Sequence, residues 1–182
     1  MTVHDLHLNG AYLIEPDVYG DARGFFMELW HHRRYADHDM GAAFVQDNLS
    51  RSAHGVLRGL HFQNPHPQGK LITVLEGEVY DVIVDIREGS DTFGDWHGVT
   101  LSGENKRQVY IPEGFAHGFL VTGEGALFHY KCTDVYAPAA ETSIRWNDPT
   151  LNIDWPVDDP TLSEKDQNAP LLDDLPAERF RF

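Results

Sequence analysis

The chain has 182 residues, of which 41% are hydrophobic and 24% charged, values typical of one ordinary globular domain. No apolar run is long enough for a membrane span, and the N-terminus lacks the basic and apolar segments of a secretory signal, so we expect a cytoplasmic protein without a membrane partner. The net charge of −15 argues against a nucleic-acid partner, because such proteins need a basic footprint. The charge leaves open whether the protein is adapted to a salt-rich cytoplasm or is simply kept soluble. The single cysteine, Cys132, excludes an internal disulfide framework and fits a reducing compartment.

The N-terminal part, residues 1–43, is expected to hold strands at 11–14 and 24–30, followed by a short helix or irregular loop at 31–40. Beyond it, short runs of Val, Ile, Leu, Phe and Tyr alternate with Gly-, Asn- or Pro-containing breaks, a pattern typical of a sandwich or jelly roll. The strands expected there cover residues 44–49, 55–63, 70–76, 78–86, 96–101, 107–111, 117–122 and 126–133. Turns are expected between them at 76–77, 87–90, 102–105 and 123–125.

The chain changes character after Tyr136 and becomes rich in Pro and Asp. This last part, residues 137–182, is expected to wrap the preceding strands with short helices. Ser163, followed three residues later by Asp166, matches a helix-start signature. We therefore predict one domain over 1–182, with a barrel core at 44–136 and two wrapping ends.

Two segments resemble the motifs of the cupin superfamily of small jelly-roll barrels. The first holds His61-Phe62-Gln63, then Lys70 and, after six residues, Gly77; the second reads Pro112-Glu113-Gly114-Phe115-Ala116-His117. The turn-forming glycines and proline of the pattern are present, but only two of the four metal-ligand positions hold histidine. The resemblance implies a mainly β fold, a cupin jelly-roll barrel with short C-terminal helices.

A pocket with two imidazoles and a lysine is a poor site for a divalent cation, because such an ion needs three or four N, O or S donors and is repelled by an ammonium. We therefore expect no metal and no cofactor. His61 and His117 would then be available for proton transfer, which suits a group that titrates near neutrality. The other nine histidines are expected to be surface or packing residues.

Nine longer segments occur together and in order, and they narrow the resemblance. They are DARGFFMELW, FVQDNLSRS, GVLRGLHFQ, PQGK, VYDVIVDIREGSDTFGDW, IPEGFAHGF, YKCTDVY, WNDP and LSEKD. Together they resemble the dTDP-4-dehydrorhamnose 3,5-epimerase family over about residues 12–172. The resemblance implies an isomerase that acts on a dTDP-4-keto-6-deoxy sugar, removing protons from C3 and C5 beside the C4 ketone and returning them to the opposite faces.

The resemblance also assigns catalytic roles. His61 falls on the family's base position, and Asp166 on the carboxylate that orients the base. Tyr130 falls on the proton donor, and a neutral phenol can donate at pH 7. Lys70 occupies the vacated metal-ligand position, where its charge would stabilise an enolate oxygen. From the pattern alone, Asp166 is a surface helix-start acid and Tyr130 a core aromatic residue.

The nucleotide is expected to need arginine forks for its diphosphate and an aromatic face for its thymine, which the resemblance assigns to Tyr136. Regular strand alternation would place Arg58 and His61 on opposite faces, so we expect a bulge at Gly59 to re-aim one of them. Leu49 departs from the family, which often has His there. The remaining substrate-binding positions that carry over are Arg23, Glu28, Gln46, Asp47, Asn48, Arg58, His117, Glu141 and Lys165.

Family enzymes are homodimers whose N-terminal segments are exchanged, so Arg23 and Glu28 would reach the neighbour's pocket. Three alternatives to the double epimerase stay open on the sequence. They are a sister enzyme that inverts only C3 or C5 of another dTDP-4-keto-6-deoxy sugar, a metal-dependent cupin enzyme, and a non-catalytic sugar-nucleotide binding module. Gln63 and Lys70 speak against the metal enzyme, and the combination of base, acid and orienting carboxylate against the binding module.

Overall fold

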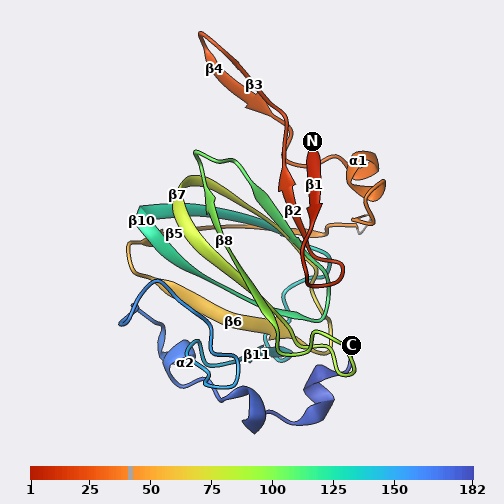
Figure 1. The fold of residues 1–182 in the computed structure, drawn as a ribbon, viewed down its shortest axis with the longest axis vertical. Coiled ribbons are helices and arrows are strands. Elements are labelled where there is room, and N and C mark those ends of the chain that lie inside the picture. Colours follow the sequence, from red (N-terminus) through yellow and green to blue (C-terminus); the bar gives the residue numbers. More distant parts are fainter. Residues whose placement is uncertain (41–42) are drawn as a thin grey trace.

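The computed structural model describes residues 1–40 and 43–182, and its regular structure is mainly strands (Figure 1). The helices are short: α1 (His32–Ala36), α2 (Glu164–Gln167), and the 3-10 turns η1 (Leu172–Asp174) and η2 (Ala177–Phe180). The strands are β1 (Thr2–Asp5), β2 (Tyr12–Glu15), β3 (Val18–Asp21), β4 (Gly24–Met27), β5 (Gln46–Ala53), β6 (Leu57–Gln63), β7 (Lys70–Asp85), β8 (Trp96–Ser102), β9 (Gln108–Ile111), β10 (Phe115–Cys132) and β11 (Glu141–Ser143).

Two long antiparallel strands, β7 and β10, form the centre of the barrel, and each changes its outer partner halfway along. The first part of β7 pairs with β9 and its second part with β8. The first part of β10 pairs with β6 and its second part with β5. This exchange of partners curls one sheet into a barrel that is open on one side (Figure 1).

The turns expected at 76–77 and 123–125 are wrong, because both segments lie inside the long strands. Gly77 has a φ of +76°, and a Cβ on it would come within 1.7 Å of the Gly125 carbonyl oxygen. The register shifts between Val121 and Ala126, so β10 carries extra residues where the two strands bend together. Gly77 therefore allows the backbones of β7 and β10 to approach closely without ending either strand.

Alternation along the strands separates two apolar layers. Val79 and Ile83 of β7 point into the barrel, where they join Phe119 and Phe128 of β10. Side chains of the other face pack against the C-terminal segment, which wraps beneath β6 in Figure 1. That outer layer contains Leu57, Leu60, Val82, Val84, Leu120, Ile144, Leu151, Trp155, Leu172 and Phe180.

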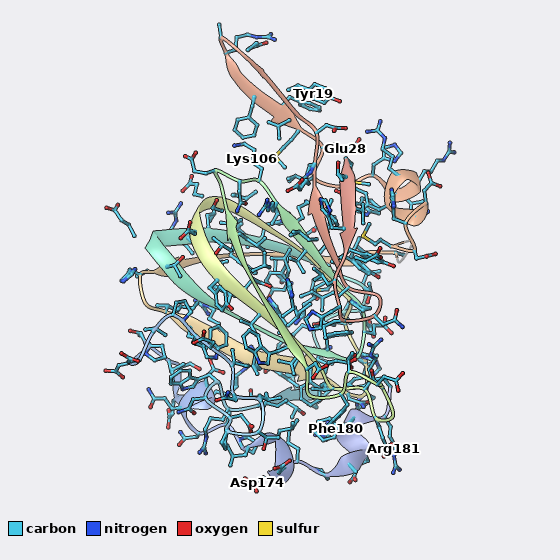
Figure 2. All side chains as sticks on the ribbon, in the orientation of Figure 1. Tyr19, Glu28, Lys106, Asp174, Phe180 and Arg181 are labelled. Carbon is cyan, nitrogen blue, oxygen red and sulfur yellow. The ribbon has the colours of Figure 1, made fainter. Side chains whose placement is uncertain are left out.

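The two ends of the chain differ in how they pack. β1 and β2 extend the main sheet next to β9, whereas β3 and β4 form a separate hairpin that projects from the barrel and carries Tyr19 (Figure 2). Phe180 and Arg181 lie at the opposite end of the molecule in that view. The strand expected at 24–30 is limited to Gly24–Met27, and β1, β3 and β11 were not expected. The short helix within 31–40 and the helix start at Ser163 are confirmed.

Membrane-spanning helices are absent from the described ranges 1–40 and 43–182, where no helix has the length and apolar character required to cross a bilayer.

Candidate active site

A pocket inside the barrel gathers polar and charged side chains among aromatic rings. Strands β5, β6, β7 and β10 all contribute to it. Phe119 and Phe128 stack within it, with their ring centroids 4.0 Å apart. The residues that line the pocket are Ser50, Arg58, His61, Lys70, His117, Phe119, Phe128 and Tyr130.

A bulge at Gly59 brings Arg58 and His61 into the same pocket. Arg58 lies opposite Phe119 and His61 opposite His117, so three steps along β6 match two along β10. Gly59 has a φ of +120°, and a Cβ on it would lie 2.6 Å from the Gly118 Cα. The predicted bulge is therefore confirmed, and only glycine fits at its centre.

His61 forms a hydrogen bond to a buried carboxylate from the C-terminal segment. Its Nε2 lies 2.5 Å from Asp166 Oδ1, and the Asp166 residue is 2% exposed. Ser163, the N-cap of α2, donates its hydroxyl hydrogen to Asp166 Oδ2 at 2.8 Å. Burial raises the pKa of Asp166, but the His61 and Ser163 hydrogen bonds outweigh burial and hold this pKa below its usual value. An ionised Asp166 fixes Nε2 as the protonated ring nitrogen, so the Nδ1 lone pair is available to accept a proton.

His117 forms a second such pair, with Asp81 of β7. His117 Nε2 donates to Asp81 Oδ2 at 2.9 Å, and both residues are buried. Burial lowers the pKa of His117, with Asp81 opposing the shift and Lys70 and His61 adding to it. The sequence reasoning missed Asp81. Its signal was a lone acid at an inward-facing position between the apolar residues Val79 and Ile83.

Lys70 and Tyr130 complete the polar side of the pocket. Burial lowers the pKa of Lys70, although Cys132, Asp81 and Glu141 all oppose this shift. Burial also raises the pKa of Tyr130, so its phenol keeps its proton at neutral pH. Both groups are therefore hydrogen donors under ordinary conditions.

The donor set does not fit a divalent metal ion. Both pocket histidines are hydrogen-bonded to carboxylates through Nε2, and Lys70 supplies an amine to the pocket wall where a ligand carboxylate would be needed. Within residues 1–40 and 43–182, no group of three or more His, Cys, Asp or Glu side chains is placed to hold a metal.

A second group of candidate residues is linked by hydrogen bonds near the pocket. Tyr136 donates its hydroxyl hydrogen to Glu141 Oε2 at 2.9 Å, and Lys165 Nζ lies 2.9 Å from Glu141 Oε1. Gln46 accepts from the Tyr136 backbone amide and donates to Asn48 Oδ1 at 3.0 Å. The structure thus brings together five of the predicted substrate-binding residues, from β5, β11, α2 and the segment before β11.

Three predicted substrate-binding residues belong neither to the pocket lining nor to this second group. Arg23 is at the tip of the projecting hairpin, where it pairs with Asp21, and Glu28 pairs with Arg34. Asp47 points to the outer face of β5, where it pairs with Lys131 at 2.6 Å. Their substrate-binding roles stay predictions.

Known proteins resemble this chain over nearly its whole length. A family model described as dTDP-4-dehydrorhamnose 3,5-epimerase matches residues 5–174. The Pseudomonas aeruginosa protein of that name is 57% identical over 161 residues, which cover 86% of this chain and 88% of the relative.

Solved structures give the same result. The dTDP-6-deoxy-D-glucose-3,5-epimerase of Legionella pneumophila Philadelphia 1, in complex with dTDP-4-keto-L-rhamnose, is 54% identical with a TM-score of 0.95 and covers 100% of this chain and 98% of that one. ChmJ, a 3'-monoepimerase from Streptomyces bikiniensis in complex with dTDP-quinovose, is 37% identical with a TM-score of 0.87, over 93% of this chain and 87% of that one. The chain has the cupin jelly-roll fold expected from its motifs, and it belongs to the dTDP-4-dehydrorhamnose 3,5-epimerase family.

Proposed function

We propose that this chain is an isomerase that inverts C3 and C5 of dTDP-4-dehydro-6-deoxy-D-glucose to give dTDP-4-dehydro-L-rhamnose, in the synthesis of dTDP-L-rhamnose. The observation that carries the proposal is the pocket itself, in which a carboxylate-held histidine, a neutral phenol and a buried lysine face one space. The family membership and the relatives of more than 50% identity support it.

His61 is the base of the proposed mechanism. Its Nδ1 takes the proton from C3 or C5, and the electron pair of the broken C–H bond moves into an enolate with the C4 oxygen. The imidazolium that forms is stabilised by the ionised Asp166 at 2.5 Å. Tyr130 then returns a proton to the same carbon from the other face, which inverts it.

Lys70 stabilises the enolate oxygen. It is a buried hydrogen donor on the pocket wall, and a preorganised donor is worth most where water is excluded. His117 is a proposed substrate-binding residue, and Asp81 holds it through its Nε2. Lys70 supplies the stabilisation that a metal ion supplies in other barrels of this type, so the proposed reaction uses no metal and no cofactor.

The diphosphate and thymine of the substrate are held at the edge of the pocket. Arg58 is the guanidinium that lines the pocket, and its Nε donates to Ser52 Oγ at 3.0 Å. Tyr136, half-exposed beside Glu141, offers its ring to the thymine. Gln46, Asn48, Glu141 and Lys165 complete the nucleotide-binding residues.

The protein is further proposed to be a homodimer, with residues 1–43 exchanged between subunits around one 1–182 domain. The β3–β4 hairpin supports this proposal, since it projects from its own barrel and exposes Val18, Tyr19, Phe25 and Phe26. In the dimer, Arg23 and Glu28 would reach the neighbour's pocket. Sedimentation of the purified chain tests this, and a monomer that turns over at full rate would contradict it. A cytoplasmic location stays a prediction.

A single-site epimerase is the second candidate. It is favoured by one observation, that the ChmJ monoepimerase has the same fold at a TM-score of 0.87. Base, acid and lysine would be needed by either enzyme, so the pocket residues do not discriminate between them.

Solvent exchange followed by NMR tests the proposal. The purified protein is mixed with dTDP-4-keto-6-deoxyglucose in heavy water, and the signals of C3 and C5 are followed. Deuterium at both carbons together with the L-lyxo product is the expected result. Deuterium at one carbon alone would identify the single-site enzyme, and no exchange at either would contradict an epimerase that acts on this sugar.

A further inference from the structure

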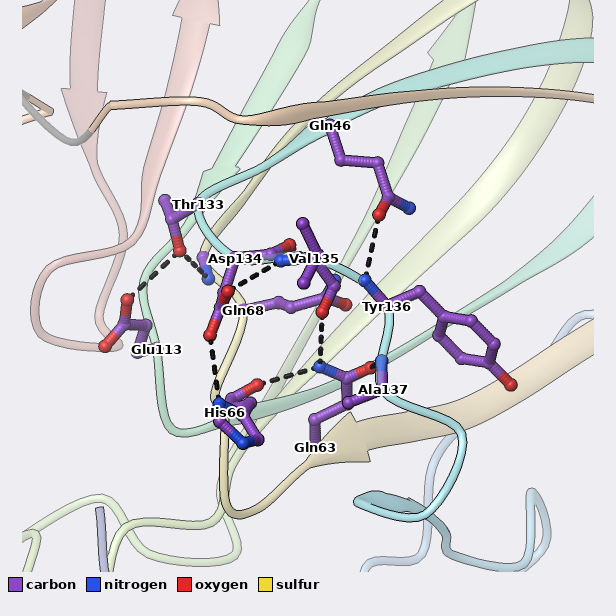
Figure 3. A network of polar contacts seen from close by, with 11 residues as sticks. Gln46, Gln63, His66, Gln68, Glu113, Thr133, Asp134, Val135, Tyr136 and Ala137 are labelled. Carbon is purple, nitrogen blue, oxygen red and sulfur yellow. Dashed lines mark hydrogen bonds and ion pairs between the residues drawn. The ribbon is translucent and has the colours of Figure 1, made fainter.

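Tyr136 is exposed, yet the segment that carries it is tied to the barrel. Half of the Tyr136 surface is open to solvent. In Figure 3, however, the backbone of residues 134–137 is surrounded by hydrogen-bonding side chains, and the Tyr136 ring extends away from them. An exposed aromatic ring on a fixed backbone is a preformed surface for stacking, because little freedom is lost when a planar ligand binds.

Gln63 makes the most contacts with this segment. It ends β6, is 4% exposed, and accepts a hydrogen bond at Oε1 from the Ala137 amide at 2.9 Å. Its Nε2 donates to the His66 carbonyl at 2.8 Å and to the Val135 carbonyl at 3.3 Å. The carboxamide thus binds the residues on both sides of Tyr136 and ties them to the loop after β6 (Figure 3).

The Gln63 side chain is used for this contact and not for the pocket. By position it corresponds to the second histidine of a metal-binding cupin, but it is not among the residues that line the pocket. Its backbone neighbour across the β6–β11 pair is Glu141, whose carboxylate accepts from the Tyr136 hydroxyl at 2.9 Å. Two adjacent strands therefore hold Tyr136, one through the main chain beside it and one through its phenol.

We propose that Gln63 is a positioning residue for nucleotide binding, which fixes residues 134–137 so that the Tyr136 ring is presented to the thymine base. This inference rests on the proposed function, because it takes a thymine nucleotide to be the ligand. Gln63 contributes to affinity for the base and takes no part in the proton transfers at His61 and Tyr130. A vacated metal-ligand position thus serves base recognition.

The test is a double-mutant cycle on the full-length protein, with Gln63→Met, Tyr136→Ala and the double variant. Methionine is uncharged and close in size to glutamine, but it cannot form the three hydrogen bonds of the Gln63 carboxamide. Titration calorimetry measures Kd for dTDP and, separately, for inorganic pyrophosphate, which has no base to stack. The matched control is Gln68→Met, because Gln68 makes one contact with the segment, to the Asp134 carbonyl at 2.8 Å.

The expected results separate positioning from a general structural role. Tyr136→Ala weakens dTDP binding about tenfold, and Gln63→Met about fivefold, on the scale of base–aromatic stacking. In the Tyr136→Ala background Gln63→Met has almost no further effect. Pyrophosphate binding stays within about twofold of wild type in each variant, and Gln68→Met keeps the binding of both pyrophosphate and dTDP within that range.

Additive losses in the double variant would overturn the inference, as would a fall in kcat with dTDP affinity unchanged. If Gln63→Met does not fold, Gln63→Glu replaces it, since a carboxylate still accepts from Ala137 but opposes both carbonyl groups. Failure of wild-type protein to bind dTDP would overturn the proposed function itself. If the wild-type protein binds dTDP and Gln63→Met binds it with the same affinity, only the proposed role of Gln63 is overturned.

Discussion

His61 and His117 lie directly opposite each other on β6 and β10, and each is hydrogen-bonded through Nε2 to a carboxylate from a different element. Asp166 reaches His61 from α2 in the C-terminal segment, whereas Asp81 reaches His117 from the neighbouring strand β7. The two imidazoles that a metal barrel would point at an ion are thus held by acids. This arrangement favours proton transfer at the pocket, with Tyr130 and Lys70 as the other participants.

Tyr130→Phe should keep solvent exchange and lose inversion. The base can still remove a proton from the substrate and return deuterium to the same face, but no acid remains on the other face. NMR in heavy water would then show deuterium in unchanged starting sugar, with product formation reduced by about 10²-fold or more. Normal product formation by this variant would rule out Tyr130 as the proton donor.

Lys70→Met should stabilise the fold while it lowers the activity. Burial lowers the pKa of Lys70, so the folded protein disfavours the ammonium at neutral pH, and this cost disappears only as the pH rises toward the unfolded value of 10.5. Methionine removes the cost, and we expect about 1 kcal/mol or more of added stability in urea unfolding at pH 7. Turnover should fall about 10²-fold with the loss of the enolate donor. If Lys70→Met were less stable than wild type, contacts of the Lys70 side chain would outweigh the cost of burying its ammonium.

The stability that Asp166 contributes should depend on pH in a defined direction. The folded pKa of Asp166 is below its unfolded value of 3.8, so its contribution is complete above that value and is lost as the pH falls through the folded pKa. The difference in unfolding free energy between wild type and Asp166→Asn should therefore be larger at pH 5 than at pH 2.5. An equal difference at both pH values would mean that the ionised carboxylate adds nothing to the fold.

Gly59→Ala should be strongly destabilising, because the bulge leaves no room for a Cβ. The added atom would lie 2.6 Å from the Gly118 Cα and 2.7 Å from the His117 carbonyl oxygen, at a positive φ. We expect a loss of about 3 kcal/mol or more in urea unfolding. Gly55→Ala is the control, with a φ of +74° but no atom within 4 Å, and should cost only about 1 kcal/mol. If both variants lost a similar amount of unfolding free energy, the positive φ would account for the whole loss, and the contact of the added Cβ with Gly118 and His117 would contribute nothing.

Local patterns predicted much of the barrel but not its two long strands. The sequence predicts turns at Gly77 and Gly125 because glycine usually marks a break, whereas Gly77 lets the backbone of β10 approach closely and Gly125 that of β5. The sequence predicts that Arg58 and His61 share a face of their strand because Gly59 indicates a bulge; regular alternation alone would place them on opposite faces. Asp81 was missed because an acid between apolar residues of a strand belongs to no motif with a defined spacing. The pairing of Asp81 with His117 is a long-range contact that only the folded sheet defines.

The position of the hairpin at residues 18–27 could not be predicted from the sequence either. Its exposed aromatic residues read as ordinary strand formers, and nothing local says that the strands leave the barrel. Likewise, the sequence assigned Gln63 only as a missing metal ligand. Its actual contacts, with His66, Val135 and Ala137, depend on where two loops meet.

The central claim is that one histidine, His61, removes the protons from both C3 and C5. Deuterium incorporation by the His61→Ala variant tests this claim most directly. The variant is mixed with dTDP-4-keto-6-deoxyglucose in heavy water, and C3 and C5 are followed by NMR beside wild type. Exchange at both carbons should fall by about 10³-fold or more, while binding of dTDP is unchanged. Full exchange at either carbon would contradict the assignment of His61 as the base at that position.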